Sequence, residues 1–298
     1  MTEGRPAVGS ILWYLGITFV ITWGVEGVLI ARGVSFVGFP PQYAQLVVAS
    51  VMWVPALGAF LAARICGETV VPYGWRFGRF PPYLVVGLAT PVVFFVAYGA
   101  TVLLDLGRLD LTLASFFEQM ARATGQPVPQ IPDPRELVAV LFVVTTFLTP
   151  FINTLFGLGE EIGWRGFLLP RLLPLGKPRA YLLSGIIWGL WHAPLVLMGF
   201  AFPGFPIAGI VLFIVFTTIM GTILNELALR YRSVILAGFG HGVFNSQGYG
   251  IWKMIVPASQ PLLGGMPGLV GLVALAVTAG IVVQSLRAGT EGGYAAND

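Results

Sequence analysis

Charged residues are scarce in this chain. Of its 298 residues, 10% are Asp, Glu, Lys or Arg, whereas 56% are hydrophobic, and the mean hydropathy is +0.85. A soluble domain of this length would carry far more charge. The net charge of +3 is small and scattered along the chain, which does not favour nucleic-acid binding. The composition therefore indicates a protein with several membrane-spanning segments.

Cysteine and several catalytic motifs are also missing. The single cysteine, Cys66, excludes an internal disulfide and a metal cage built from cysteines. The sequence has neither the His-Glu-x-x-His pattern of zinc peptidases nor the Gly-x-Ser-x-Gly turn of serine hydrolases. A membrane aspartyl dyad is disfavoured because every aspartate falls outside the apolar segments. These aspartates are Asp105, Asp110, Asp133 and Asp298.

Long apolar runs are abundant. A spanning helix needs about 20 mostly apolar residues. The sequence predicts an all-α fold with about eight such helices, roughly at 10–31, 43–66, 82–104, 136–166, 180–200, 206–230, 233–250 and 267–287. No linker divides the chain, so we expect one transmembrane domain over 1–298, with a motif-bearing core at about 136–250.

The distribution of Lys and Arg predicts an orientation. Eight crossings place both termini on one side, and that side carries eleven Lys and Arg against five on the other. Positively charged loops favour the cytosol, so both termini are predicted to be cytosolic. The segment at about 105–135 is then an external loop, with a short interfacial helix followed by an extended stretch.

Ionisable residues inside a membrane are costly and therefore point to function. Both histidines of the chain, His192 and His241, fall within predicted spans, and Asn245 follows His241 by one helical turn. Glu160 and Glu161 are adjacent, so their side chains point about 100° apart on a helix. The spacing of Glu161 and Arg165 predicts an ion pair, which leaves Glu160 free to face another group.

Water activation is the chemistry that fits these residues. A carboxylate in an apolar pocket is a suitable general base, and a histidine can orient the water or pass on its proton. A second histidine with a nearby asparagine can donate hydrogen bonds to a developing oxyanion. The set therefore predicts a peptide-bond hydrolase without a covalent nucleophile. Its members are Glu160, His192, His241 and Asn245.

These segments resemble the CAAX-protease and bacteriocin-processing family of membrane endopeptidases, also called the abortive-infection family, whose type member is the Ras-converting CAAX protease. The family pattern is Glu-Glu-x-x-x-Arg, then aromatic-x-x-x-His, then His-x-x-x-Asn. Trp188 stands where the family more usually has Phe. The matching segments are Glu160-Glu161-Ile162-Gly163-Trp164-Arg165, Trp188-Gly189-Leu190-Trp191-His192 and His241-Gly242-Val243-Phe244-Asn245.

The resemblance implies an eight-helix fold with an intramembrane cavity open to the cytosol. It also implies that Glu160 and His192 activate water, while His241 and Asn245 form the oxyanion hole. The remaining motif residues would be supports: Glu161, Arg165 and Trp188. No cofactor is expected, although a zinc site remains an alternative, with ligands Glu160, His192 and His241.

The expected partner is a membrane-associated peptide or lipidated protein, cut near the cytosolic membrane face. A prenylated C-terminal CAAX tail, which would lose its last three residues, is one candidate substrate. Alternatives from other classes are a proton-coupled transporter and a non-catalytic immunity or scaffold protein. Glu26 and Glu226, with Asn225 beside it, also lie near the ends of predicted spans and are interpreted as structural or interfacial.

Overall fold

The computed structural model describes residues 8–36, 41–68, 72–258 and 260–291. Within these ranges the fold is all-α, and the β-structure is confined to an isolated bridge between Gly107 and Ala258. The helices are α1 (Val8–Ala31), α2 (Pro41–Val51), α3 (Val54–Ile65), α4 (Pro81–Leu103), α5 (Ala114–Thr124), α6 (Pro134–Val143), α7 (Thr149–Gly163), α8 (Leu169–Leu172), α9 (Lys177–Trp191), α10 (Ala193–Leu197), α11 (Pro206–Arg230), α12 (Val234–Tyr249), α13 (Ile251–Ile255) and α14 (Leu269–Glu291).

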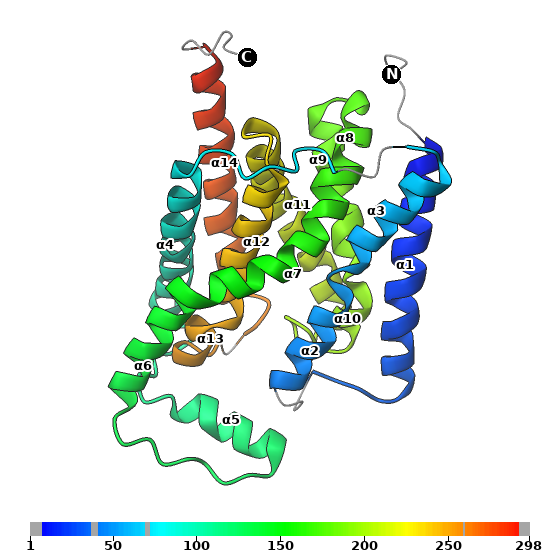
Figure 1. Ribbon diagram of the computed structural model, residues 1–298. Helices are drawn as coiled ribbons and strands as arrows, with labels where there is room; N and C mark the ends of the chain where they lie inside the picture. Colours follow the sequence, from blue (N-terminus) through cyan, green and yellow to red (C-terminus); the bar gives the residue numbers. More distant parts are fainter. Residues whose placement is uncertain (1–7, 37–40, 69–71, 259, 292–298) are drawn as a thin grey trace.

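The helices form the bundle of a polytopic membrane protein (Figure 1). In the described part of the chain, five helices are long and apolar enough to cross a membrane. The outer surface is apolar, as Val20, Val85 and Val273 show with more than half of each side chain exposed. An apolar surface of this kind suits lipid rather than water. The five helices are Val8–Ala31, Leu46–Ile65, Pro81–Leu103, Pro134–Leu175 and Pro206–Arg230. Of the other three predicted crossings, two correspond to the shorter helices α9 and α12, and the third to α14, whose apolar part is Leu269–Ser285. The count of eight therefore stays a prediction.

Helix α1 turns its polar side inward. Its buried residues recur every fourth position and are mostly polar, whereas the rest of the helix is apolar and faces outward. Small residues of α3 allow close packing: a Cβ on Gly58 would come within 2.2 Å of the Thr18 hydroxyl. The buried stripe consists of Ser10, Tyr14, Thr18, Thr22 and Glu26.

The predicted helix at 180–200 is broken at a functional candidate. Helix α9 ends at Trp191, His192 takes φ −84° and ψ −3°, and α10 begins at Ala193. Pro194 explains the break, because proline has no N–H to continue the helix and its ring crowds the preceding turn. The sequence analysis placed His192 inside a continuous span, whereas the structure places it at the junction of two helices.

The long span that begins at Pro134 contains two π-helical turns, η1 (Val144–Leu148) and η2 (Trp164–Leu168). Pro150 follows η1 and cannot donate to the carbonyl five residues earlier. That carbonyl, of Thr145, instead accepts hydrogen bonds from Ser246 (2.5 Å) and Gln247 (3.3 Å) of α12. The irregularity thus connects α7 to α12, the helix against which α7 packs most extensively.

The loop at 105–135 has the predicted form. It contains α5 and then an extended stretch that ends at Asp133, whose carboxylate caps α6 by accepting from the N–H of Arg135 at 2.9 Å. Helix α5 and α13 lie at the lower end of the bundle, while the start of α1 and the end of α14 lie at the upper end (Figure 1). The terminal residues 1–7 and 292–298 are outside the described residues.

Candidate functional site

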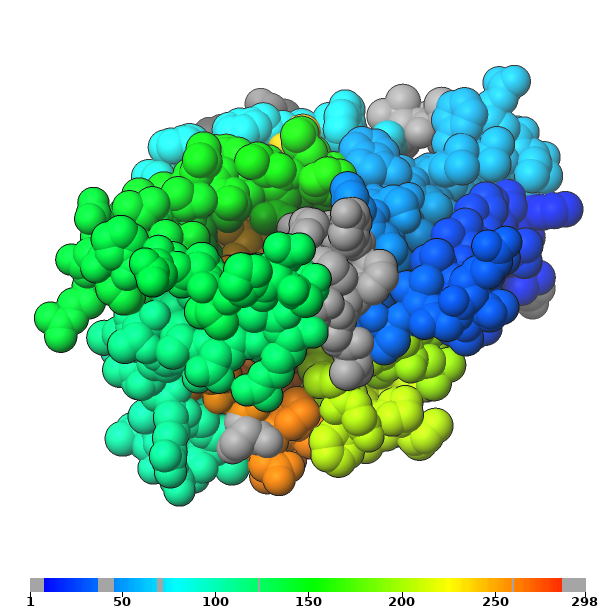
Figure 2. Space-filling view, turned by 90° about the horizontal axis from the view of Figure 1, so that it is seen from below, coloured from blue at the N-terminus to red at the C-terminus, as the bar shows by residue number. Residues whose placement is uncertain are grey.

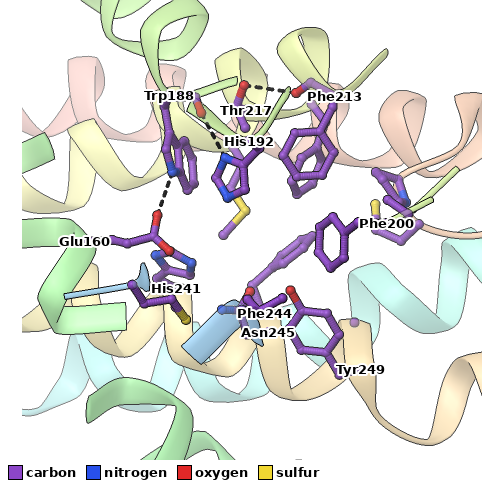
Figure 3. A pocket seen from close by; sticks show the side chains of 18 of the residues that line it. Glu160, Trp188, His192, Phe200, Phe213, Thr217, His241, Phe244, Asn245 and Tyr249 are labelled. Atoms are coloured by element: carbon purple, nitrogen blue, oxygen red, sulfur yellow. Dashed lines mark hydrogen bonds between the residues drawn. The ribbon is translucent and has the colours of Figure 1, made fainter. Parts of the chain in front are cut away.

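The structure brings the four predicted catalytic residues to one cavity. Glu160 comes from α7, His192 from the junction of α9 and α10, and His241 and Asn245 from α12. The space among the lining residues is about 620 Å³, which includes the part that is open to solvent. Figure 3 shows Glu160 and His241 beside each other, with His192 and Trp188 next to them.

The Glu160 carboxylate is held by two indole groups. Trp188 donates from Nε1 to Oε2 at 2.7 Å, and Trp164 donates to the same oxygen at 3.3 Å. The side chain is 2% exposed, and among the described residues no donor contacts Oε1. One oxygen is therefore fixed and the other remains available toward the cavity that Glu160 lines. The bond from Trp164 could not be predicted from the sequence, in which Trp164 is only a variable position of the first motif.

His192 is fixed in one tautomer. Its Nδ1 lies 2.8 Å from the backbone carbonyl oxygen of Trp188. A carbonyl oxygen can only accept, so Nδ1 carries the hydrogen and the unprotonated Nε2 is the atom left for the cavity. The ring is also enclosed by aromatic neighbours, with Trp191 4.7 Å and Phe213 4.8 Å away between ring centroids.

Glu161 has two partners. The predicted ion pair is confirmed, with Arg165 Nη1 3.0 Å from Glu161 Oε1. The same oxygen lies 2.8 Å from Nδ1 of His241, a contact that the sequence analysis did not anticipate. Arg165 is buried and also donates from Nε to Oδ1 of Asn225 at 3.0 Å. Arg165 is one of the eleven Lys and Arg residues assigned to the terminal side, and its burial shows that it is not a loop charge.

The three other polar residues lie in different surroundings, and the structural or interfacial interpretation stays a prediction for Glu26. Asn225 supports the site through Arg165, and Glu226 pairs with Lys177, the first residue of α9, at 2.7 Å. Glu26 is buried in α1 without a hydrogen-bond partner among the described residues, and it does not line the cavity.

Trp188 is the residue that connects the site. Its ring lies under the Arg165 guanidinium at 4.5 Å and edge-on to His241 at 5.4 Å between centroids. Its indole N–H binds Glu160, and its carbonyl oxygen binds His192 (Figure 3). Only tryptophan supplies the indole donor, so the departure from the more usual Phe adds a hydrogen bond to the carboxylate.

The cavity opens at the lower end of the bundle. Around Glu160 and His192 its lining is buried, whereas Val48, Gly248 and Tyr249 are partly exposed and Lys253 is exposed. These residues lie on α2, at the end of α12 and on α13, at the end away from the start of α1 (Figure 1). Seen from this end, the surface is hollowed beside the green α5–α7 region (Figure 2). The cavity mouth and the start of α1 thus lie at opposite ends of the bundle. If the termini are cytosolic, the cavity mouth faces the opposite compartment, and the two predictions exclude each other.

The wall opposite the glutamate is apolar and aromatic. Phe200, Phe213 and Phe244 line it (Figure 3), and Phe216 also lines the cavity. Phe213 and Phe216 lie 5.3 Å apart and Phe216 and Phe244 5.4 Å apart between centroids. Such a surface suits an apolar peptide segment or a hydrocarbon chain rather than a charged group.

The alternative zinc ligands are not arranged as a ligand set. Within the described ranges, no group of three or more His, Cys, Asp and Glu side chains is placed to hold a metal ion. One oxygen of Glu160 already accepts from two indoles, and Nδ1 of His241 is directed at Glu161. These bonds leave Oε1 of Glu160 and Nε2 of both His192 and His241 without a hydrogen-bond partner among the described residues, so they do not decide between a metal-free site and a zinc site.

Comparison with known proteins identifies the segment that holds this site. A family model described as type II CAAX prenyl endopeptidase Rce1-like matches residues 136–247, which include all three motifs and all four candidate catalytic residues. A search of curated proteins found no match. The segment that supplies the four candidate catalytic residues is therefore similar to the Rce1-like type II CAAX prenyl endopeptidases.

Proposed function

We propose that this protein is an intramembrane endopeptidase that releases the C-terminal tripeptide of a prenylated CAAX protein or peptide. The observation that carries the proposal is the Glu160 carboxylate, fixed through one oxygen by Trp188 and Trp164 in a cavity that also contains His192. The family match supports the reaction class, and the aromatic wall suits a lipidated substrate.

In the proposed reaction, Glu160 and His192 hold the attacking water between them. Oε1 of Glu160 takes one proton from the water while the water oxygen adds to the scissile carbonyl carbon. The unprotonated Nε2 of His192 accepts a hydrogen bond from the other O–H of the water, which stays on the oxygen, and so orients that oxygen for attack. The Trp188 hydrogen bonds keep both groups in place, so little reorganisation is needed at the moment of attack.

The oxyanion would be stabilised from α12. In this proposal His241 is protonated, its charge is balanced by the Glu161 carboxylate 2.8 Å away, and Nε2–H donates to the developing oxyanion. The side-chain amide of Asn245, one turn further along, is the second donor. One such donor contributes about 3–4 kcal/mol. The intermediate then collapses: the C–N bond breaks, and the leaving amine takes the proton held by Glu160.

The decisive experiment is cleavage of a quenched fluorescent, farnesylated CAAX peptide by the purified protein in detergent. Glu160→Gln keeps the size of the side chain but removes the base. We expect its kcat to fall by roughly a thousandfold or more, while the protein stays folded. A Glu160→Gln enzyme that is as active as the wild type would exclude Glu160 as the base.

A chelator series tests the zinc alternative in the same assay. Because the proposed mechanism uses only side chains, activity should survive prolonged incubation with a zinc chelator. Loss of activity on chelation, restored by added zinc, would favour a metallopeptidase with Glu160, His192 and His241 as ligands. A wild type that is folded and inactive on all lipidated peptides would favour the transporter or scaffold alternatives.

A further inference from the structure

A lysine lies in the cavity at the end away from Glu160. Lys253, on α13, lines the same cavity as the four candidate catalytic residues. Among the described lining residues it is the one lysine or arginine. It lies outside the matched segment 136–247, and neither the proposed water activation nor the oxyanion hole uses it.

Lys253 has no partner of its own in the part of the chain that the structure describes: it takes part in no ion pair and no hydrogen bond. The carboxylate of Asp110, in the loop bonded to α13, already accepts from the N–H groups of Thr112 (3.0 Å) and Ser115 (2.9 Å). Lys253 keeps accessible surface, yet desolvation by the surrounding protein lowers the pKa of its amine. Accessible surface together with desolvation is expected for a side chain that faces a cavity inside the protein, as Lys253 does.

The helix that carries Lys253 is held in place. The Trp252 indole donates to Gln247 Oε1 at 2.7 Å, and the N–H of Asp110 donates to the carbonyl oxygen of Ile255 at 2.7 Å. The chain turns at Gly250, where a Cβ would come within 2.4 Å of Thr145. The backbone beneath Lys253 is therefore fixed relative to α12 and η1.

The spacing along the chain has the length of a short peptide. His241, Asn245, Tyr249 and Lys253 all line the cavity at intervals of four residues. Eight helical residues rise about 12 Å, so Lys253 lies on the order of 10 Å from Asn245 once the turn at Gly250 is allowed for. Three extended residues span about 10–11 Å. When the scissile carbonyl of a substrate lies beside Asn245 and three residues follow it, the C-terminus of the substrate would thus reach Lys253.

We propose that Lys253 binds the C-terminal carboxylate of the substrate and so sets the cut three residues from the end of the chain. The proposal rests on the endopeptidase function above. It adds that the open end of the cavity recognises the C-terminal carboxylate of the substrate. An ammonium group without a partner, in a largely apolar cavity, gains most from a carboxylate that arrives with the substrate. A lysine that only anchored α13 at the membrane surface would have no reason to line the cavity.

The test compares two farnesylated peptides that differ only at the C-terminus, one with a free carboxylate and one with a carboxamide. Wild type should cleave the carboxylate peptide roughly 10- to 100-fold more efficiently, as kcat/KM, which is the range for a charge-assisted hydrogen bond. Lys253→Met should lower kcat/KM for the carboxylate peptide to the value for the amide peptide and leave kcat/KM for the amide peptide unchanged. Lys253→Arg should retain most of the preference. Arg122→Met, which removes an exposed charge from α5 at the same end of the molecule, is the matched control.

Binding of the same peptides to Glu160→Gln protein separates this proposal from the proposed reaction. Tighter binding of the carboxylate peptide that disappears in Glu160→Gln/Lys253→Met supports the subsite even where wild type cleaves neither peptide. Such a result would leave Lys253 as the carboxylate site and overturn the endopeptidase function alone. Equal binding and equal cleavage of the two peptides, or an equal loss for both in Lys253→Met, would overturn the role of Lys253.

Discussion

At the scale of single residues, the two adjacent glutamates have separate tasks. Glu160 faces the cavity and is held by indole N–H groups, whereas Glu161 points away and balances Arg165 and His241. The geometry follows from the helix, because neighbouring side chains diverge by about 100°. The spacing predicted the Arg165 pair. It could not predict the His241 contact, which depends on how α7 and α12 approach each other.

Substituting each glutamate by glutamine should separate these tasks. Glu161→Gln leaves the buried Arg165 without its countercharge, and breaking a buried pair costs about 3–5 kcal/mol. We therefore expect a clearly lower Tm for Glu161→Gln and a nearly unchanged Tm for Glu160→Gln, measured by thermal unfolding in detergent. Equal Tm values for both variants would contradict the assignment of Glu161 as the charge-balancing residue.

Trp188→Phe tests the hydrogen bond that phenylalanine cannot make. Loss of a bond to a buried carboxylate costs about 1.5–3 kcal/mol, so kcat on the farnesylated peptide should fall roughly 10- to 100-fold while the aromatic packing is kept. Trp23→Phe is the matched control, since it removes an indole bond of 3.2 Å on α1 away from the cavity. Unchanged activity of Trp188→Phe would show that the bond to Glu160 does not contribute to catalysis.

At the scale of the helices, glycine decides how closely α7 and α12 approach. A Cβ on Gly242 would lie 2.4 Å from the backbone nitrogen of Thr154, and one on Gly157 would lie 3.0 Å from the carbonyl oxygen of Gly238. This close contact places His241 beside Glu161. Backbone approach through small residues is the usual way for helices to pack in membranes, where lipid removes the hydrophobic drive to associate.

Gly242→Ala adds only one methyl group, but it should lower both the stability of the protein and its cleavage activity. The added methyl group forces the two helices apart, with a cost of about 1–3 kcal/mol in stability, and lengthens the contact between Glu161 and His241. The control is Gly99→Ala on α4, where a Cβ meets nothing within 4 Å and helix propensity favours alanine by up to about 1 kcal/mol. Thermal unfolding and peptide cleavage should both rank Gly242→Ala well below Gly99→Ala. The reverse ranking would contradict the role of the glycine contact.

At the scale of the whole molecule, the cavity and the start of α1 face opposite ends of the bundle. The Lys and Arg distribution predicts that the end carrying Cys66 is cytosolic, although the burial of Arg165 removes one charge from that comparison. The cavity mouth would then face the opposite compartment. The sequence could not show this conflict, because the direction in which a cavity opens depends on how the helices pack.

Cysteine labelling decides the orientation. Cys66 is exposed and is the one cysteine in the chain, and Arg122→Cys in a Cys66→Ser background places a thiol on α5 at the other end. With cytosolic termini, a membrane-impermeant maleimide should label position 122 in intact cells and Cys66 only after lysis. The reverse pattern would place the cavity mouth in the cytosol and show that the loop charges were misleading.

The sequence by itself determined the all-α membrane fold, the positions of the long apolar segments and the identity of the candidate site residues. Hydropathy and helical spacing are local properties, and the few polar residues in apolar segments stand out against them. Only the tertiary structure decided that His192 ends a helix, that Glu161 contacts His241 eighty residues away, and that Lys253 shares the cavity. These features depend on contacts between helices, which are fixed by glycine spacing, proline breaks and unpaired carbonyl groups acting together rather than by any one segment.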